Sequence, residues 1–273
     1  MRQLTDCHIH TERCGHAVGT VDEYVAAGVK HGLLGMVITE HLALPDDLDP
    51  HRNLSMPACD LDDYLVEVDL TRQRYPEIEV ISGIEADFLP GREGATAMAL
   101  AAAKNRSDGV RMVLGSVHFI DGWVFDDPNR IEEWERHDVD VAWRDYFSLW
   151  CDAVRSGMFD VMAHPDLVKK FGHRPTFDPR ELYAEAARVA SSAGVLIEVS
   201  TAGLRKPVAE LYPGHELLAA FRQAGVAATA GSDAHDPSEV GYKIESAYDA
   251  LARAGYESVQ FPDGSGEWRS LPL

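Results

Sequence analysis

The chain has 273 residues, of which 45% are hydrophobic, and its formal net charge is −20. A chain of this length and apolar content can bury one large core, and α/β barrels of this size form single domains. The negative charge argues against nucleic acid or an anionic membrane surface as a partner, because both attract basic patches. No internal repeat or compositional shift marks a boundary, so residues 1–273 are predicted to form one domain.

Neither a membrane span nor a secretory segment is expected. The longest apolar runs are far too short to cross a bilayer, and no secretory apolar region follows Met1-Arg2. The four cysteines contain no C-x-x-C pair, which is typical of free thiols in a reducing compartment. A cytoplasmic location is therefore expected, whereas the sequence leaves the oligomeric state open.

Short apolar segments alternate with helical patterns along the chain. Strands are expected at Gln3–His8, Leu34–Thr39, Ile78–Ile84, Met112–Val117, Val161–Ala163, Val195–Val199 and Val226–Ala230. Helices are expected at Val21–Lys30, Leu61–Arg74, Thr96–Lys104, Val141–Arg155, Pro179–Ser192, Glu216–Gln223 and Ile244–Ala254. The β-α order favours parallel strands joined by right-handed crossovers. Seven units predict an α/β fold, a distorted TIM-like (β/α)7 barrel with a more open mouth than the eight-unit barrel.

Two segments fall outside this regular alternation. The acidic stretch from Phe119 to Asp140 is long and contains Trp123 and Trp134. Long loops on the catalytic face of a barrel form lids or substrate walls. The second segment, Ser258–Phe261, fits either an eighth short strand or a C-terminal tail packed at the bottom of the barrel. We favour the tail.

Six of the seven predicted strands end in residues that can bind a divalent metal. Such residues at the carboxyl ends of parallel strands would meet at one rim, the active-site face. The pair His8-x-His10 is weak by itself, because twelve histidines make it a frequent chance event. The joint pattern is stronger, and so many ligands imply several metal ions. Only the strand ending in Glu198-Val199-Ser200-Thr201 breaks the series. The strand-end candidates are His8, His10, His41, Glu85, His118, His164, Asp233 and His235.

These strand ends resemble the successive motifs of the PHP (polymerase and histidinol phosphatase) family along nearly the whole chain. The motifs are Asp6-x-His8-x-His10, Thr39-Glu40-His41, Gly83-Ile84-Glu85, Ser116-Val117-His118, Ala163-His164-Pro165 and Ser232-Asp233-Ala234-His235. The segments His10–Ala17 and Ser200–Pro207, the latter with Tyr212-Pro213, are similar to those of the histidinol-phosphate phosphatase branch. That branch has a distorted seven-unit barrel and a trinuclear metal centre.

The resemblance implies three divalent ions, and nitrogen and oxygen ligands suit Zn, Mn or Fe. It also implies how the ligands are shared, with Glu85 as a bridge between two ions. The implied sets are His8, His10, Glu85 and Asp233 for the first ion, Glu85, His118 and His164 for the second, and His16, His41 and His235 for the third.

A phosphate substrate also needs fixed charges outside the metals. Arg205 follows the strand without a ligand, and a guanidinium matches phosphate bidentately. Asp166 could protonate the leaving alkoxide or hold a cationic group of the substrate. The predicted catalytic residues are Asp233, His235, Asp166 and Arg205, the predicted substrate-binding residues are Arg205, Lys169, Asp166 and Glu12, and Lys170, Arg174 and Asp87 are further candidates.

The function that the resemblance implies is hydrolysis of L-histidinol phosphate to L-histidinol and phosphate, a step of histidine biosynthesis. One alternative is a PHP phosphatase for another small phosphomonoester, such as a nucleotide, a sugar phosphate or phosphotyrosine. A phosphodiesterase or exonuclease is disfavoured by the charge and by the lack of a basic stripe with interleaved aromatics. A non-catalytic module would be expected to have lost ligands, and none of the nine positions is lost.

Overall fold

The computed structural model of the chain describes residues 2–106 and 109–273. Within these ranges, seven parallel strands form one sheet in the order β1-β2-β3-β4-β7-β8-β9. They are β1 (Thr5–Asp6), β2 (Gly35–His41), β3 (Glu79–Asp87), β4 (Met112–Ser116), β7 (Val161–Met162), β8 (Leu196–Ser200) and β9 (Ala228–Gly231). The N–H of Cys7 donates to the Ala230 carbonyl and that of His10 to the Ala234 carbonyl, both at 2.9 Å, so β1 also meets β9. The predicted distorted (β/α)7 barrel is confirmed.

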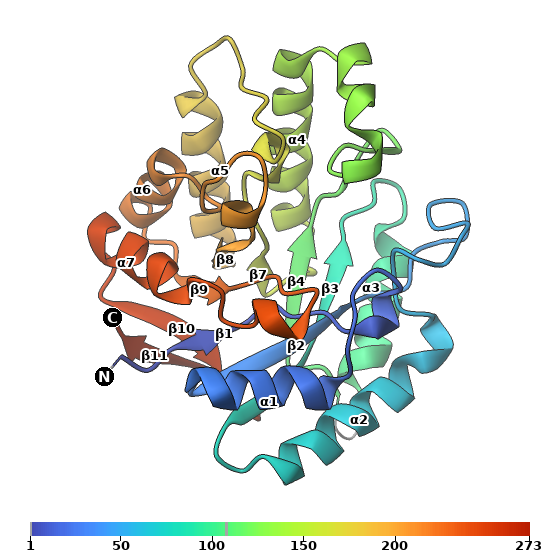
Figure 1. Cartoon of the computed structure of the whole chain (residues 1–273). Helices are drawn as coiled ribbons and strands as arrows, with labels where there is room; N and C mark the ends of the chain where they lie inside the picture. Colours follow the sequence, from blue (N-terminus) through green and yellow to red (C-terminus); the bar gives the residue numbers. More distant parts are fainter. Residues whose placement is uncertain (1, 107–108) are drawn as a thin grey trace.

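The helices lie around the outside of the strands (Figure 1). They are α1 (Val21–His31), α2 (Leu61–Arg74), α3 (Glu93–Lys104), α4 (Val139–Arg155), α5 (Arg180–Ala193), α6 (His215–Gln223) and α7 (Ile244–Ala254). Local signals fix their ends. In α1, Thr20 and Glu23 form a capping box, and Gly32 ends the helix in the left-handed region with φ of 69°. Within the described part of the chain, no helix has the length and apolar content to cross a membrane.

The C-terminal segment closes the amino-terminal end of the barrel. Strand β10 (Ser258–Pro262) pairs antiparallel with β11 (Trp268–Pro272) and is not part of the seven-stranded sheet. The tail interpretation is therefore confirmed, although the hairpin itself was not predicted. Phe261 packs against Gly35 at the start of β2, where a Cβ atom would lie 2.5 Å from the ring. Gly35 therefore provides the space that lets the hairpin approach the barrel.

The segment predicted as a long loop contains ordered structure. Strands β5 (Phe119–Ile120) and β6 (Trp123–Val124) form a short hairpin, and the 3₁₀ helix η3 (Pro128–Arg136) follows. The indole N–H of Trp134 donates to the Phe125 carbonyl at 2.8 Å. The ring of Phe125 packs edge-on against Tyr146 of α4, with 5.6 Å between the centroids. Because its aromatic side chains are anchored in the core, this segment forms a fixed wall.

Candidate active site

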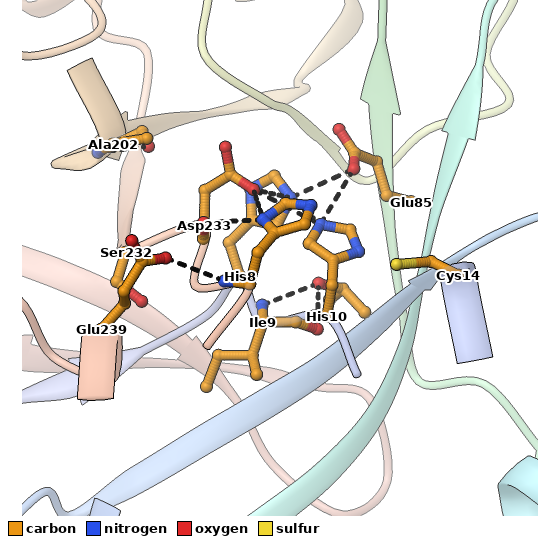
Figure 2. Close-up of polar contacts among 12 residues, drawn as sticks. His8, Ile9, His10, Cys14, Glu85, Ala202, Ser232, Asp233 and Glu239 are labelled. Atoms are coloured by element: carbon orange, nitrogen blue, oxygen red, sulfur yellow. Dashed lines mark hydrogen bonds and ion pairs between the residues drawn. The ribbon is translucent and has the colours of Figure 1, made fainter. Parts of the chain in front are cut away.

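Glu85, at the end of β3, lies at the centre of the predicted ligands and is 1% exposed. Its two oxygens face different histidines. Oε2 lies 3.2 Å from Nε2 of both His8 and His10, whereas Oε1 lies 3.0 Å from Nε2 of His164 and 3.9 Å from Nε2 of His118. Figure 2 shows the first of these two sides, with the imidazoles of His8 and His10 converging on Glu85 and Asp233. A carboxylate in this position can join two groups of ligands.

The groups themselves have the spacing of metal ligands. His8, His10 and Asp233 form one set, and Glu85, His118 and His164 form a second, with the ligand atoms of each within 4.8 Å of one another. Nε2 of His8 is 2.9 Å from Nε2 of His10. Two imidazole nitrogens this close share at most one proton, and a divalent cation between them would satisfy both lone pairs. The donor set therefore fits divalent metal ions.

The third predicted set is spread over two overlapping groups. His10, His41 and His235 form one of them, and Cys14, His16 and His235 form the other. Nε2 of His16 is 3.1 Å from Nε2 of His235 and 3.9 Å from Sγ of Cys14. His16 and His235 therefore meet as predicted, while the thiol of Cys14 is a neighbour to which the sequence assigned no role.

Several imidazoles are oriented by a hydrogen bond from their second nitrogen. Nδ1 of His8 is 2.9 Å from Oε1 of Glu198, and Nδ1 of His118 is 3.0 Å from Oδ1 of Asp87. Glu198 also accepts the main-chain N–H of His164 at 2.9 Å through its other oxygen. Such partners fix the tautomer and the ring direction of a metal ligand. Strand β8, which carries no predicted ligand, thus positions His8 and His164 through Glu198.

Close backbone approach makes the Glu198 contact possible. A Cβ atom at position 231 would lie 2.2 Å from Oε1 of Glu198 and 2.7 Å from Cβ of His8. Gly231 ends β9, between the two side chains, so no larger residue fits there without displacing one of them.

The turn that carries Asp233 is held by two charged residues. Asp233 adopts φ of 52°, a conformation that is unfavourable for residues other than glycine. Asp6 accepts the Ser232 N–H at 2.8 Å and the Ser232 hydroxyl at 2.5 Å. Nη2 of Arg205 donates to the carbonyls of Ser232 and Asp233, at 2.9 and 3.0 Å. These contacts stabilise the strained turn from both sides.

The central carboxylates are anionic because of their cationic surroundings. Burial by itself would raise the pKa of Glu85, but the charges of His8 and His41 hold that pKa well below its usual value. The pKa of Asp233 is likewise held low against the effect of burial, chiefly by the charge of His8. Both carboxylates therefore stay ionised, and a divalent cation would replace the imidazole protons that now compensate their charge.

A cavity of about 480 Å³ opens over the ligand groups. Its lining includes His41, Glu85, His118, His164, Asp233 and His235, and outside these groups it includes Asp126, Lys170, Lys206 and Tyr212. Lys206 has no ion-pair or side-chain hydrogen-bond partner among the described residues. Burial lowers the pKa of Lys206. The cavity therefore combines the ligand groups with an unpaired ammonium group beside Asp233.

None of the four predicted substrate-binding residues lines this cavity. Asp166 and Lys169 form a buried ion pair, with 2.7 Å between Oδ2 and Nζ, and Lys169 also donates to the Leu211 carbonyl at 2.8 Å. Glu12 is exposed in a short 3₁₀ helix beyond β1. The charges of Asp166 and Lys169 are thus used within the protein.

Arg205, the predicted phosphate-binding residue, is likewise absent from the cavity lining. Its guanidinium holds the Ser232 and Asp233 carbonyls and lies 3.1 Å from Glu239. Its neighbour Lys206 lines the cavity instead. Of the further candidates, Lys170 and Asp87 line the cavity, whereas Arg174 pairs with Glu210 at 2.5 Å.

The residues that sequence reasoning missed carry little local signal. Glu198 belongs to no predicted ligand motif, and Lys206 lies in the segment Ser200–Pro207, in which only Arg205 was assigned a role. Asp126 lies in the acidic stretch, among carboxylates that look alike in sequence. Glu198 was the one visible exception in the series of strand ends, and a carboxylate at that place was the available clue.

A comparison of the sequence with protein-family models identifies the family of this chain. The PHP domain model matches residues 6–202, which include Asp6 and the ligands from His8 to His164. The chain belongs to the PHP domain family. Asp233 and His235 lie beyond the matched segment, and the structure brings them to the same rim.

Two relatives that are named as histidinol-phosphatases match nearly the whole chain. A Deinococcus radiodurans protein named "Probable histidinol-phosphatase" is 38% identical over 263 residues, covering 96% of this chain and 97% of the relative. The histidinol-phosphatase of Bacillus subtilis is 25% identical over 267 residues, covering 89% of this chain and 97% of the relative. The resemblance inferred from the motifs is confirmed.

A solved structure shows the same fold. The histidinol phosphate phosphatase of Lactococcus lactis, complexed with zinc, L-histidinol and phosphate, superimposes with a TM-score of 0.82 at 20% identity. The match covers 98% of this chain and 99% of that one. The agreement extends over the whole barrel.

Proposed function

We propose that this PHP protein hydrolyses L-histidinol phosphate to L-histidinol and phosphate at a divalent-metal centre on the rim of the barrel. The observation that carries the proposal is the position of Glu85, whose two oxygens face two separate groups of histidines. Relatives named as histidinol-phosphatases cover nearly all of the chain, which supports the choice of substrate.

The proposed centre holds three ions, of Zn, Mn or Fe. His8, His10 and Asp233 with Glu85 would hold the first, His118 and His164 with Glu85 the second, and His16, His41 and His235 the third. Bound divalent ions supply positive charge for the phosphoryl oxygens and lower the pKa of coordinated water. Glu198 and Asp87 keep the imidazoles of His8 and His118 in the required orientation.

The phosphoryl group needs protein cations as well as metals. Lys206 and Lys170 are the cavity-lining ammonium groups, and Lys206 is unpaired among the described residues. We assign Lys206 to the phosphoryl oxygens. The role of Arg205 is then to hold the Ser232 and Asp233 carbonyls and so to keep Asp233 in place. In this proposal Lys206 binds the substrate, whereas Arg205 positions a metal ligand.

A phosphate-release assay on the metal-loaded protein tests the proposed function. The panel contains L-histidinol phosphate, a nucleoside monophosphate, a sugar phosphate, phosphotyrosine and p-nitrophenyl phosphate. We expect kcat/KM to be highest for L-histidinol phosphate and activity to disappear after prolonged chelation. High activity on another monoester with none on L-histidinol phosphate would refute the substrate assignment while leaving the metal centre intact.

A further inference from the structure

The cavity wall formed by residues 119–137 carries Asp126, a carboxylate that none of the roles above uses. Its side chain is 16% exposed and lines the cavity. Oδ2 lies 2.9 Å from Nζ of Lys170, whose side chain is 13% exposed. A charged pair this far removed from bulk water is costly to keep unless it has a function or strong partners.

The backbone on either side of Asp126 is fixed. On one side, the Phe125 carbonyl accepts the indole N–H of Trp134 at 2.8 Å, and the Phe125 ring is buried. On the other side, the carboxylate of Asp127 accepts the Asn129 N–H at 2.8 Å and caps η3. Asp126 is therefore presented to the cavity by a rigid support, which is the requirement for a selective contact.

Asp126 differs from the other carboxylates of the cavity lining in having no role as a ligand, as a hydrogen-bond partner of a ligand or as a helix cap. Glu85 and Asp233 belong to the ligand groups, Asp87 is bonded to His118, and Asp127 caps η3. Oδ2 of Asp126 is paired with Lys170, but Oδ1 accepts no hydrogen bond from any residue that the structure describes. The carboxylate stays ionised, because the charges of Lys170 and His118 outweigh burial and hold the pKa of Asp126 below its usual value.

The cavity lining near Asp126 is suited to the ring and the carbon chain of an amino alcohol that carries a ring. Phe119, Val124 and Leu167 give the cavity apolar walls. Tyr212 also belongs to this lining, and its hydroxyl is buried and has no hydrogen-bond partner among the described residues. A buried hydroxyl without a partner is unfavourable, so a polar atom of a bound ligand would stabilise it.

We propose that Asp126 binds the ammonium group of the substrate and so makes the site selective for phosphomonoesters of amino alcohols. This inference rests on the proposed function and adds the residue that recognises the alcohol. Oδ1 accepts a hydrogen bond from the substrate ammonium while Oδ2 keeps its contact with Lys170. A charge-assisted contact in a cavity sheltered from water is strong enough to decide between two otherwise identical esters.

The test combines one substitution with one change in the substrate. Wild type and Asp126→Asn, both fully metal-loaded, are assayed with L-histidinol phosphate and with the same ester lacking the amine, 3-(imidazol-4-yl)propyl phosphate. The wild type should prefer the amine-containing ester by on the order of 10- to 100-fold in kcat/KM, and the variant should lose most of that preference. Any effect that Asp126→Asn transmits through Lys170 falls on both esters alike and cancels in the ratio.

Asp127→Asn is the matched control, because asparagine caps a helix as well as aspartate does. It should leave the preference for the amine-containing ester unchanged. Binding of L-histidinol to the metal-loaded proteins, measured by calorimetry, gives a second readout. Asp126→Asn should raise the Kd of L-histidinol by about the same factor as its loss of kcat/KM preference, with metal content unchanged.

The outcomes separate this inference from the proposed function. A wild type that hydrolyses both esters equally well, or an Asp126→Asn variant that keeps the full preference, would overturn the role of Asp126 and leave the phosphatase assignment standing. A wild type inactive on both esters but active on other monoesters would overturn the proposed function itself.

Discussion

At the carboxyl end of the barrel strands, seven histidines of the described chain surround the buried Glu85 and the partly exposed Asp233. The amino end is instead covered by the β10–β11 hairpin and its apolar contacts. The carboxyl end contains features that are unfavourable for folding. Among them are the left-handed backbone conformations of His164 and Asp233. The amino end contains a large aromatic ring packed against a glycine. In barrels of this class, one end therefore serves chemistry and the other serves stability. Substitutions at the two ends should separate activity from folding.

The largest effect is expected from Glu85→Gln. The amide cannot bridge two groups of ligands as a carboxylate does, so the variant should lose bound metal. Its kcat should fall on the order of 1000-fold or more, because a metal ion supplies several kcal/mol of transition-state stabilisation. Elemental analysis and phosphate release measure both effects, and circular dichroism should show an intact fold. Retention of most of the activity would exclude Glu85 as a bridge.

The opposite pattern is expected from Phe261→Ala. Removing a buried aromatic ring should lower the free energy of unfolding by about 3–5 kcal/mol. Denaturant unfolding measures this loss, and Phe261→Leu should cost less because it fills part of the space. Metal content and kcat at 25 °C should stay close to those of the wild type. A large loss of kcat in the folded variant would contradict the separation between the two ends.

Glu198→Gln sharpens the comparison within the catalytic end. The carboxylate accepts hydrogen from both Nδ1 of His8 and the N–H of His164, and an amide has only one acceptor oxygen for these two donors. We expect metal affinity to fall about 10- to 100-fold, measured by competition with a chelator. Glu185→Gln on the exposed face of α5 is the control for the lost charge. Unchanged metal affinity in Glu198→Gln would show that Glu198 does not position the ligands.

The smallest effects should distinguish Lys206 from Arg205. Lys206→Ala should lower kcat/KM by on the order of 10-fold with unchanged metal affinity, because it removes one ammonium from the phosphoryl site. Arg205→Ala should weaken metal binding, because it releases the carbonyls that hold the Asp233 turn. Chelator competition together with steady-state kinetics separates the two. If Arg205→Ala keeps its metals and loses kcat/KM, Arg205 contacts the substrate as the sequence first suggested.

Much of the fold follows from local patterns in the sequence. Helices such as α2 and α7 begin and end where the apolar period predicts, and strand positions follow from buried apolar runs. The histidines at strand ends could be grouped for the same reason, since parallel strands deliver their carboxyl ends to one rim.

Other features depend on contacts between distant residues and could not be predicted. The wall around Asp126 is ordered by aromatic packing onto α4, not by its own propensity. The choice between Arg205 and Lys206 depends on how one short turn is oriented. The ion pair of Asp166 with Lys169 is buried by residues more than 40 positions away, including Leu211.

The close packing around Gly231 predicts which mutations a genetic selection would recover. Gly231 has no functional group, yet a single methyl group at this position would collide with both Glu198 and His8. A selection for loss of function should therefore recover substitutions at Gly231 alongside those at the ligands themselves. In a comparison of natural variants, position 231 should tolerate change as poorly as the proposed metal-binding histidines, although glycine has no side chain that could act as a ligand.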